Sequence, residues 1–413
     1  MKIKHRLLFV MLLLPVAALF AQWQPMGPPG GNFRALAMAS SNDNIQYLAS
    51  STYPSSIWKT TNAGNSWNRV GSVSDNVYSM AVDPTNANIV YAGGINYMFR
   101  STNGGSAWTQ QTLPTYHWYV YETKVHPTTP TTIMAACWIY ANSYYRMGFL
   151  KSTNSGTTWM SETLGVDTSY AYGLAIDPTR PQNVYVAGYK YGSGIYAPVV
   201  YKSTDGGDNF SPTGSFSGSS YYCYSVAVHQ TNSNYVYAGT LYGVYRSTDG
   251  GTSWTQTSTG NYNYSISTTP INANLLYSGG AGVIYRSTDA GATWGSSSTG
   301  LVGSLFYGLA PSRTQATRVY AANNVDFYRS TDGGVNWATA DAGLYAAPVN
   351  AMNNAPSAPG TIYIDNNGAK QCRSTNNGAT WTGLTLALGC GSLCAFGVAS
   401  NNPNYVLEFE GSG

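Results

Sequence analysis

Short segments in which apolar and polar residues alternate recur along most of the chain. One clear pair occupies residues 78–82 and 89–93, with a polar turn that begins at Asp83 and Pro84 between them. Copies lie at 172–178 with 183–188 and at 224–229 with 234–239, and a looser copy lies at 307–312 with 318–321. Alternation with a period of two predicts a pair of antiparallel strands in each copy.

A second, eight-residue pattern lies between these strand pairs and has the form Ser/Thr-x-Asp/Asn-x-Gly-x-x-Trp. We call its eight copies the box segments: residues 60–67, 101–108, 152–159, 203–210, 247–254, 287–294, 330–337 and 374–381. An Asx residue followed by Gly favours a tight turn, because Gly tolerates positive φ and Asx side chains bond to nearby backbone. The third position therefore predicts a structural turn residue in each copy: Asn62, Asn103, Asn154, Asp205, Asp249, Asp289, Asp332 and Asn376. The closing Trp, replaced once by Phe210, is predicted to enter the core.

The spacing of the box segments sets the expected architecture. Consecutive copies start 40 to 51 residues apart. Each interval holds two alternating strands, a third strand that ends in Lys or Arg before the box, and a fourth that begins at the Trp. Four strands per repeat of this length predict the blade of an all-β propeller. Eight boxes predict eight blades, or nine if the terminal segments complete a partial blade, and seven blades are the less favoured count.

The box segments and their spacing resemble the BNR/Asp-box propellers. That group contains sialidases, sortilin-type receptors, xyloglucan-cleaving hydrolases and photosystem-assembly factors, so the resemblance implies a fold and leaves the function open. It also implies that the boxes and the turns between the first two strands lie on one face. The other connections would then form the ligand-binding face. His126 and His229 align with Asp83 and are expected to be turn residues on the box face.

The first residues predict an export signal. Lys2, Lys4 and Arg6 precede an apolar run from Leu7 to Phe20, and cleavage after Ala21 is expected. Residues 1–21 are thus a predicted signal peptide and residues 22–413 a single propeller domain, secreted or at the cell surface, without a membrane span after cleavage. The formal net charge of +3 belongs to the signal, so the mature chain is near neutral and is not expected to bind nucleic acid.

The sequence offers few groups for catalysis or metal binding. Its five Cys have neither zinc spacing nor a regular disulfide pattern, and Cys137, Cys223 and Cys372 lie in strand patterns that predict buried thiols. We therefore expect no metal and no cofactor. Sialidase chemistry needs three convergent Arg. The nearest candidate is Arg34, which lies in a segment that resembles the sialidase arginine motif but lacks its Pro.

Other glycosidases need two opposed carboxylates. Candidates on the predicted ligand face are Asp75, Asp167 and Asp341 in one class of loop and Asp326 and Asp365 in another. Isolated loop Asp residues more often support turns. Six Tyr at the start of successive first strands (residues 78, 121, 172, 224, 264 and 307) are interpreted as packing between blades.

Aromatic residues are concentrated in the connections of the third and fourth blades, which are also the longest repeats. Aromatic loops on one sector of a rigid scaffold favour a binding site for sugar rings or extended peptides. The candidate ligand-binding residues are His117, Trp118, Trp138, Tyr140, Tyr144, Tyr145, Tyr189, Tyr191 and Tyr196.

The sequence thus predicts a non-catalytic propeller that binds a glycan or an extracellular protein. Two alternatives stay open. One is a glycoside hydrolase that uses carboxylates of the ligand face. The other is a self-assembling extracellular protein that forms homo-oligomers, fibres or surface arrays by pairing its terminal strands, at residues 22–27 and 393–409.

Overall fold

The computed structural model describes most of the chain between residues 32 and 410. The described ranges are 32–114, 117–141, 143–165, 168–192, 194–217, 222–258, 262–302, 305–340, 351–355, 358–365, 371–376, 381–384, 394–398 and 406–410. The predicted signal peptide lies outside the described residues. None of these residues belongs to a helix long and apolar enough to span a membrane. Every element described is a strand.

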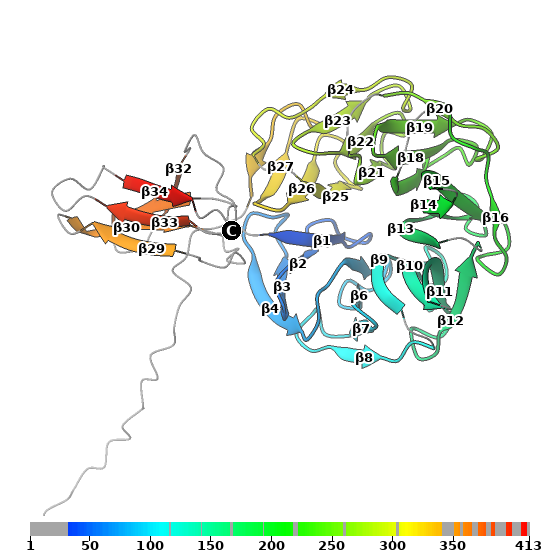
Figure 1. Ribbon diagram of the computed structural model, residues 1–413, viewed down its shortest axis with the longest axis horizontal. Coiled ribbons are helices and arrows are strands. Elements are labelled where there is room, and N and C mark those ends of the chain that lie inside the picture. Colours follow the sequence, from blue (N-terminus) through cyan, green and yellow to red (C-terminus); the bar gives the residue numbers. More distant parts are fainter. Residues whose placement is uncertain are drawn as a thin grey trace, which may run out of the picture.

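The first seven sheets each contain four strands that follow one another in sequence, and they form a ring of blades (Figure 1). Blades 1 to 4 are β1 (Phe33–Met38), β2 (Gln46–Ser50), β3 (Ser55–Thr60) and β4 (Asn68–Val73); β5 (Ser79–Val82), β6 (Val90–Gly93), β7 (Met98–Ser101) and β8 (Thr109–Gln111); β9 (His117–Val125), β10 (Ile133–Ala141), β11 (Tyr144–Ser152) and β12 (Met160–Leu164); β13 (Thr168–Ile176), β14 (Val184–Gly192), β15 (Ile195–Ser203) and β16 (Ser211–Pro212). Blades 5 to 7 are β17 (Cys223–Val228), β18 (Val236–Thr240), β19 (Gly243–Ser247) and β20 (Thr255–Gln256); β21 (Ser265–Thr268), β22 (Leu276–Gly279), β23 (Ile284–Ser287) and β24 (Gly295–Ser296); β25 (Phe306–Pro311), β26 (Val319–Asn323), β27 (Phe327–Ser330) and β28 (Ala338–Thr339).

The ring contains seven blades, so the expectation of eight is wrong. The eighth box lies in a further four-stranded sheet of β29 (Ala351–Ala355), β30 (Ala358–Asp365), β31 (Gln371–Ser374) and β32 (Thr382–Leu384). A hairpin of β33 (Cys394–Val398) and β34 (Val406–Glu410) follows it. Figure 1 shows both sheets outside the ring. Ring closure therefore cannot be read from the number of boxes.

The box segments form one repeated turn. In the fifth box, Ser247 Oγ donates to Asp249 Oδ1 at 2.8 Å and accepts the Gly251 N–H at 2.8 Å. The Asp249 carboxylate in turn accepts the Ser253 N–H at 2.9 Å. Asn62 accepts the Ser66 N–H at 3.0 Å through its amide oxygen in the same way, so the turn needs an acceptor and not a charge. The start of the eighth box, at Ser374 and Asn376, shows the same hydrogen bond at 2.9 Å.

The turn between the first two strands of a blade lies beside the box turn. In the fifth blade the Gly250 N–H donates to the Asn234 carbonyl at 2.9 Å. Equivalent bonds recur in all seven blades of the ring, at Ala63, Gly104, Ser155, Gly206, Ala290 and Gly333. The prediction that these two classes of turn share one face is confirmed. We call this the box face.

His126 and His229 occupy the turn position predicted for them. Asp83 Oδ1 accepts the Thr85 N–H at 2.8 Å, and His229 Nδ1 accepts the Thr231 N–H at 3.3 Å in the equivalent turn. His126 Nδ1 accepts the Thr129 N–H at 3.1 Å. An imidazole nitrogen thus replaces a carboxylate oxygen as the turn acceptor in two blades.

Neighbouring blades are joined by buried Tyr residues of the second strand. Tyr47, Tyr185, Tyr237 and Tyr277 are fully buried, and the hydroxyl of each donates to a backbone carbonyl of the next blade. For Tyr237 the acceptor is the carbonyl of Ala290, in the next box, at 2.9 Å. A buried hydroxyl that lacked such a partner would carry a desolvation penalty. The contact therefore fixes the angle between adjacent blades as well as filling the core.

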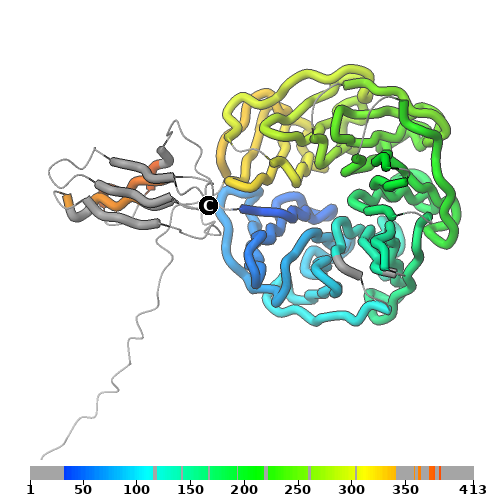
Figure 2. Tube along the Cα trace, viewed as in Figure 1, coloured from blue at the N-terminus to red at the C-terminus, as the bar shows by residue number. Residues whose placement is uncertain are grey.

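Side-chain contacts close the ring between blades 7 and 1, because all four strands of blade 1 come from one continuous segment. Figure 2 shows the start of the ring beside β25–β27. Trp67 is buried, packs edge-to-face on Phe327 at a centroid distance of 4.9 Å, and donates from Nε1 to the Ala340 carbonyl at 3.0 Å. Arg329 donates to the Ala63 carbonyl at 3.1 Å, and Ser312 bonds to Asp43.

Candidate functional site

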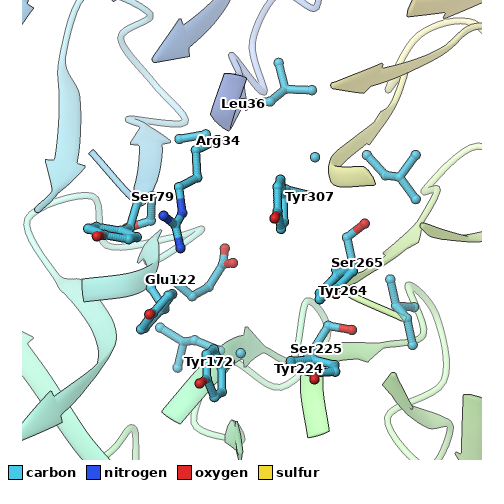
Figure 3. Close-up of a pocket in the computed structure, with 18 of the residues that line it drawn as sticks. Arg34, Leu36, Ser79, Glu122, Tyr172, Tyr224, Ser225, Tyr264, Ser265 and Tyr307 are labelled. Atoms are coloured by element: carbon cyan, nitrogen blue, oxygen red, sulfur yellow. The ribbon is translucent and has the colours of Figure 1, made fainter. Parts of the chain in front are cut away.

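The first strands of the seven blades line a central cavity of about 410 Å³. Each blade contributes one side chain at the same position, in its first strand or directly before it, and we call these seven residues the belt: Arg34, Tyr78, Tyr121, Tyr172, Tyr224, Tyr264 and Tyr307. Figure 3 shows Arg34 on one side of the cavity, with Tyr172, Tyr224, Tyr264 and Tyr307 around the remainder. A cavity of this size falls in the range of about 300–1,000 Å³ typical of small-ligand sites.

Bulges in the first strands of blades 1, 3, 4, 5 and 7 give five belt residues their direction. In blade 4 the pairing passes from Ala171 to Gly173, so Tyr172 is skipped, and in blade 5 it passes from Cys223 to Ser225, so Tyr224 is skipped. Arg34, Tyr121 and Tyr307 are skipped in the same way. A bulged residue leaves the regular alternation and its side chain is re-aimed. The belt side chains consequently line the cavity instead of following the pattern of the buried residues around them.

Glycine on the second strand makes room for this arrangement. Gly93 pairs with Ser79, the residue after Tyr78 in blade 2, and a Cβ there would collide with Ser79 and with Val120 of the next blade. Gly239 in blade 5 would collide with Ser225 and with the Asn263 carbonyl. The recurring Tyr-Ala-Gly sequence of the second strand thus combines the blade-joining Tyr with the close approach that the belt requires.

Belt rings touch from blade to blade. The centroid distances are 5.2 Å for Tyr78–Tyr121, 4.7 Å for Tyr121–Tyr172, 5.7 Å for Tyr172–Tyr224, 5.0 Å for Tyr224–Tyr264 and 5.3 Å for Tyr264–Tyr307. The expected packing between blades is confirmed. That interpretation was incomplete, because the same rings also line a cavity.

Arg34 is the exception in the belt. Its guanidinium carbon lies 3.9 Å from the centroid of the Tyr78 ring and 5.8 Å from that of Tyr121, both within cation–π range. Two other charged residues line the cavity, and they pair with each other: Lys124 Nζ lies 2.6 Å from Glu122 Oε1. Among the described residues, no carboxylate oxygen lies within 4.0 Å of Arg34. The described lining therefore carries a net positive charge centred on Arg34.

The belt phenols do not offset this charge. Burial raises the pKa of Tyr264 to about 12, and burial also raises the pKa of Tyr78, Tyr121, Tyr172, Tyr224 and Tyr307. All six stay protonated at neutral pH. Each can donate or accept a hydrogen bond at the cavity wall.

Blades 3 and 4 extend beyond their neighbours on the face opposite the box face. β10, β11, β14 and β15 each have nine residues, whereas β18 and β19 of blade 5 have five. The residues expected to form long loops instead lengthen two hairpins, because their backbone groups pair in register from Ile133–Ser152 to Ala141–Tyr144 and from Val184–Ser203 to Gly192–Ile195. Aromatic side chains are therefore presented by regular strands.

These hairpins and the first strands beside them hold an aromatic cluster that we call the platform: Trp138, Tyr140, Tyr145, Tyr170, Tyr189, Tyr191, Tyr196 and Tyr222. Trp138 lies at its centre, with ring centroids 4.7 Å from Tyr170 and 5.9 Å from Tyr145. Trp138 Nε1 donates to the Ala171 carbonyl at 3.0 Å, which orients the indole. The platform is thus a connected surface, not a set of separate side chains.

The outer part of the platform is open to solvent. Tyr140, Tyr191 and Tyr196 are 43%, 41% and 38% exposed. Tyr191 and Tyr196 face each other across the hairpin of blade 4, with ring centroids 4.7 Å apart. Exposed aromatic rings that hold each other in place are preorganised for stacking on a ligand.

The structure brings together most of the predicted ligand-binding residues. Trp138, Tyr140, Tyr145, Tyr189, Tyr191 and Tyr196 belong to the platform. Tyr144 is 56% exposed at the end of the blade 3 hairpin. The backbone of His117 and Trp118 lies in β9, and their side chains fall outside the described residues. Tyr170 and Tyr222 also belong to the platform and were not predicted as ligand-binding residues. Their signal was the alternation Tyr170–Tyr172 and Tyr222–Tyr224.

The carboxylates predicted on the ligand face do not form a described pair. Asp75 is buried and accepts the Asn76 N–H at 2.7 Å and the Ile95 N–H at 2.8 Å, so it supports a turn. Burial raises its pKa. Asp326 is also buried. Asp167 and Asp341 lie outside the described residues, as does the side chain of Asp365. Among the described residues no three His, Cys, Asp or Glu gather in a way that could hold a metal.

Comparison with solved structures places the fold among propellers. The GH74 xyloglucanase from Xanthomonas campestris is 12% identical to this chain, with a TM-score of 0.62. The alignment covers 92% of this chain and 71% of the xyloglucanase. An ancestral GH74 enzyme is 17% identical with a TM-score of 0.72; the alignment covers 95% of this chain and 60% of the enzyme. YCF48 from Cyanidioschyzon merolae is 15% identical with a TM-score of 0.52; the alignment covers 74% of this chain and 96% of YCF48.

No protein-family model and no curated protein sequence matches this chain. Identities of 12–17% show a shared fold and nothing finer. The all-β propeller of four-stranded blades is confirmed. The similar structures include GH74 enzymes and YCF48, so the fold alone does not choose a function for this chain.

Proposed function

We propose that this protein is an exported, non-catalytic propeller of the BNR/Asp-box group that binds glycan chains through the platform. The supporting observation is the exposed, mutually packed set of aromatic rings on the two extended hairpins. Flat aromatic faces suit the C–H faces of sugar rings, and neighbouring phenol hydroxyls can bond to sugar hydroxyls. Their hairpin partners hold these rings in place, so little conformational entropy is lost on binding.

Binding without hydrolysis is favoured because the described carboxylates near the cavity already have partners. Glu122 is paired with Lys124 at 2.6 Å, and Asp75 accepts two backbone N–H groups. A glycosidase needs two carboxylic groups about 5–10 Å apart, one of them free to transfer a proton. A protein partner is the second class of ligand that an aromatic surface could recognise, and it forms an outcome of the test below.

The test is a glycan-array screen followed by titration calorimetry with the glycan that binds best. Tyr191→Ala and Tyr196→Ala are expected to weaken binding at least about tenfold each, equivalent to about 1.4 kcal/mol. Tyr53→Ala is the matched control, because Tyr53 is 70% exposed and lies in blade 1, away from the hairpins.

Equal affinity of all three variants and the unmodified protein would overturn the platform as the site. A glycan array without any bound glycan, together with saturable binding of extended peptides that Tyr196→Ala abolishes, would assign the platform to a protein partner instead. Release of reducing ends from a bound glycan would show a hydrolase.

A further inference from the structure

We propose that the central cavity holds the carboxylate of a hexuronate unit, so that the glycan bound by this protein is an acidic polysaccharide. This inference rests on the proposed function, because the platform must bind the same chain. It adds a second site, centred on Arg34, and a ligand class that the platform alone does not define.

The repeat is broken at one belt position. Each of the seven blades places one belt residue at the cavity wall, and this residue is Tyr in six blades and Arg34 in blade 1. If this position served only to pack blades together, an aromatic ring would be suitable in blade 1 as well. A guanidinium instead supplies a planar group with five N–H donors, whose geometry matches a carboxylate.

The described lining of the cavity has an excess of positive charge. Arg34 lies against the faces of Tyr78 and Tyr121, which stabilise a cation but leave its N–H groups available to a ligand. Lys124 and Glu122 offset each other. Figure 3 shows the guanidinium of Arg34 directed into the cavity. A positive charge in a partly enclosed space attracts an anionic group, and the interaction is stronger there than in open water.

The aromatic residues of the cavity are in contact with those of the platform. Tyr121 lies 5.1 Å from the Trp138 ring by centroid distance, and Tyr172 lies 5.6 Å from it. Tyr121 is also the second ring beneath Arg34. One aromatic ring therefore separates the anion site from the centre of the platform. A linear sugar chain can rest on the platform while a carboxylate of the same chain reaches Arg34, with the neutral belt phenols facing its hydroxyls.

The experiment is titration calorimetry with short oligomers of galacturonate, glucuronate and mannuronate, each compared with its methyl ester. Esterification removes the charge and keeps the sugar backbone. For at least one of the three acids we expect binding at least about tenfold tighter than for its ester, and weaker binding as salt is raised. Arg34→Gln should lower the affinity for the acid to that of the ester and leave the ester unaffected.

Two variants control this result. Arg69→Gln removes the same charge from the exposed outer strand of the same blade and should leave the preference for the acid intact. Arg34→Lys keeps the charge without the planar fork and should give an intermediate affinity. Thermal melting of each variant reports whether Arg34 acts only by holding the belt together. A melting temperature that falls while the preference for the acid persists would assign Arg34 a structural role and overturn the proposal.

Failure of the inference is distinguishable from failure of the proposed function. Equal affinity for acid and ester, with both weakened by Tyr196→Ala, would overturn the anion site and leave glycan binding by the platform intact. An acid preference that survives Arg34→Gln would also overturn the anion site. If none of the three oligomers binds, or if an acidic peptide of equal charge binds as tightly, the hexuronate assignment is wrong.

Discussion

The two faces of the ring follow the sequence repeat to different extents. On the box face, the box turn and the neighbouring turn form the same backbone hydrogen bond in all seven blades. Within the turns the side-chain acceptor varies: Asp or Asn in the box turn, and Asp or His in the neighbouring turn. On the opposite face, the hairpins of blades 3 and 4 are built from nine-residue strands and carry exposed Tyr, whereas the equivalent strands of blade 5 have five residues. We therefore expect the box face to contribute mainly to stability, whereas the hairpins of the opposite face differ in length between blades because they extend outside the shared core.

Loss of a buried aromatic on the box side should have the largest effect on stability. Trp67 is 2% exposed, and its contacts with Phe327 and Ala340 close the ring of blades. Trp67→Ala removes these contacts. We expect a loss of about 3–5 kcal/mol in the free energy of unfolding, measured by chemical denaturation. Trp254→Ala, at a buried site between blades 4 and 5, is the internal control. An unchanged midpoint for Trp67→Ala would show that the seam between blades 7 and 1 contributes little.

Loss of a box hydroxyl should have an intermediate effect. Ser247→Ala leaves the Gly251 N–H without its acceptor in a buried turn, and a loss of about 1–3 kcal/mol is expected. Asp249→Asn is the matched control, because Asn fills the same position in four other boxes. Its melting temperature should stay close to that of the unmodified protein. A larger loss for Asp249→Asn than for Ser247→Ala would contradict the conclusion that the turn needs only an acceptor.

A smaller effect is expected from acidification at His229. Burial, together with the positive charge of Arg246, lowers the pKa of His229 below its usual value. Since the folded-state pKa is the lower one, the contribution of the neutral acceptor is complete above about pH 6.5. It is lost as the pH falls through the folded-state pKa.

His229→Asp, which copies Asp83 of blade 2, should remove this part of the pH dependence of melting. The comparison is made between pH 7.5 and pH 5. Identical pH profiles for the variant and the unmodified protein would show that His229 does not contribute to it.

The smallest effect on stability is expected at the hairpin ends. Tyr191→Ala and Tyr196→Ala remove exposed phenol side chains that lie outside the propeller core. Each should change the free energy of unfolding by less than about 0.5 kcal/mol. Denaturation of both variants checks this. Large losses would mean that the platform is part of the core, and would remove the distinction between the two faces.

Much of the box face could be predicted from the sequence, because its bonds are local. Ser247, Asp249 and Gly251 lie within five residues, and the turn that they form depends on φ preferences and a short hydrogen-bond network. The entry of the box Trp side chains into the core and the turn position of His229 followed from the same spacing. The number of blades did not follow, because the eighth box starts with the same Ser374–Asn376 hydrogen bond although its sheet lies outside the ring.

The candidate site was predicted only in part. The aromatic residues of blades 3 and 4 were recognised from their density, but their form as paired hairpins depends on cross-strand register. The belt was interpreted as inter-blade packing, because each Tyr lies in an apolar strand. Its direction is set by bulges such as the one at Tyr172, which appear only when the partner strand is in place.

The sequence by itself determined the blade, since a turn of eight residues and strands with a period of two specify their own geometry. Only the tertiary structure decided how many blades close into a ring and where Arg34 lies. Closure depends on contacts between residues more than 260 positions apart, such as Arg329 with Asn65. The position of Arg34 beside Tyr78 and Tyr121 depends on three blades meeting around one axis.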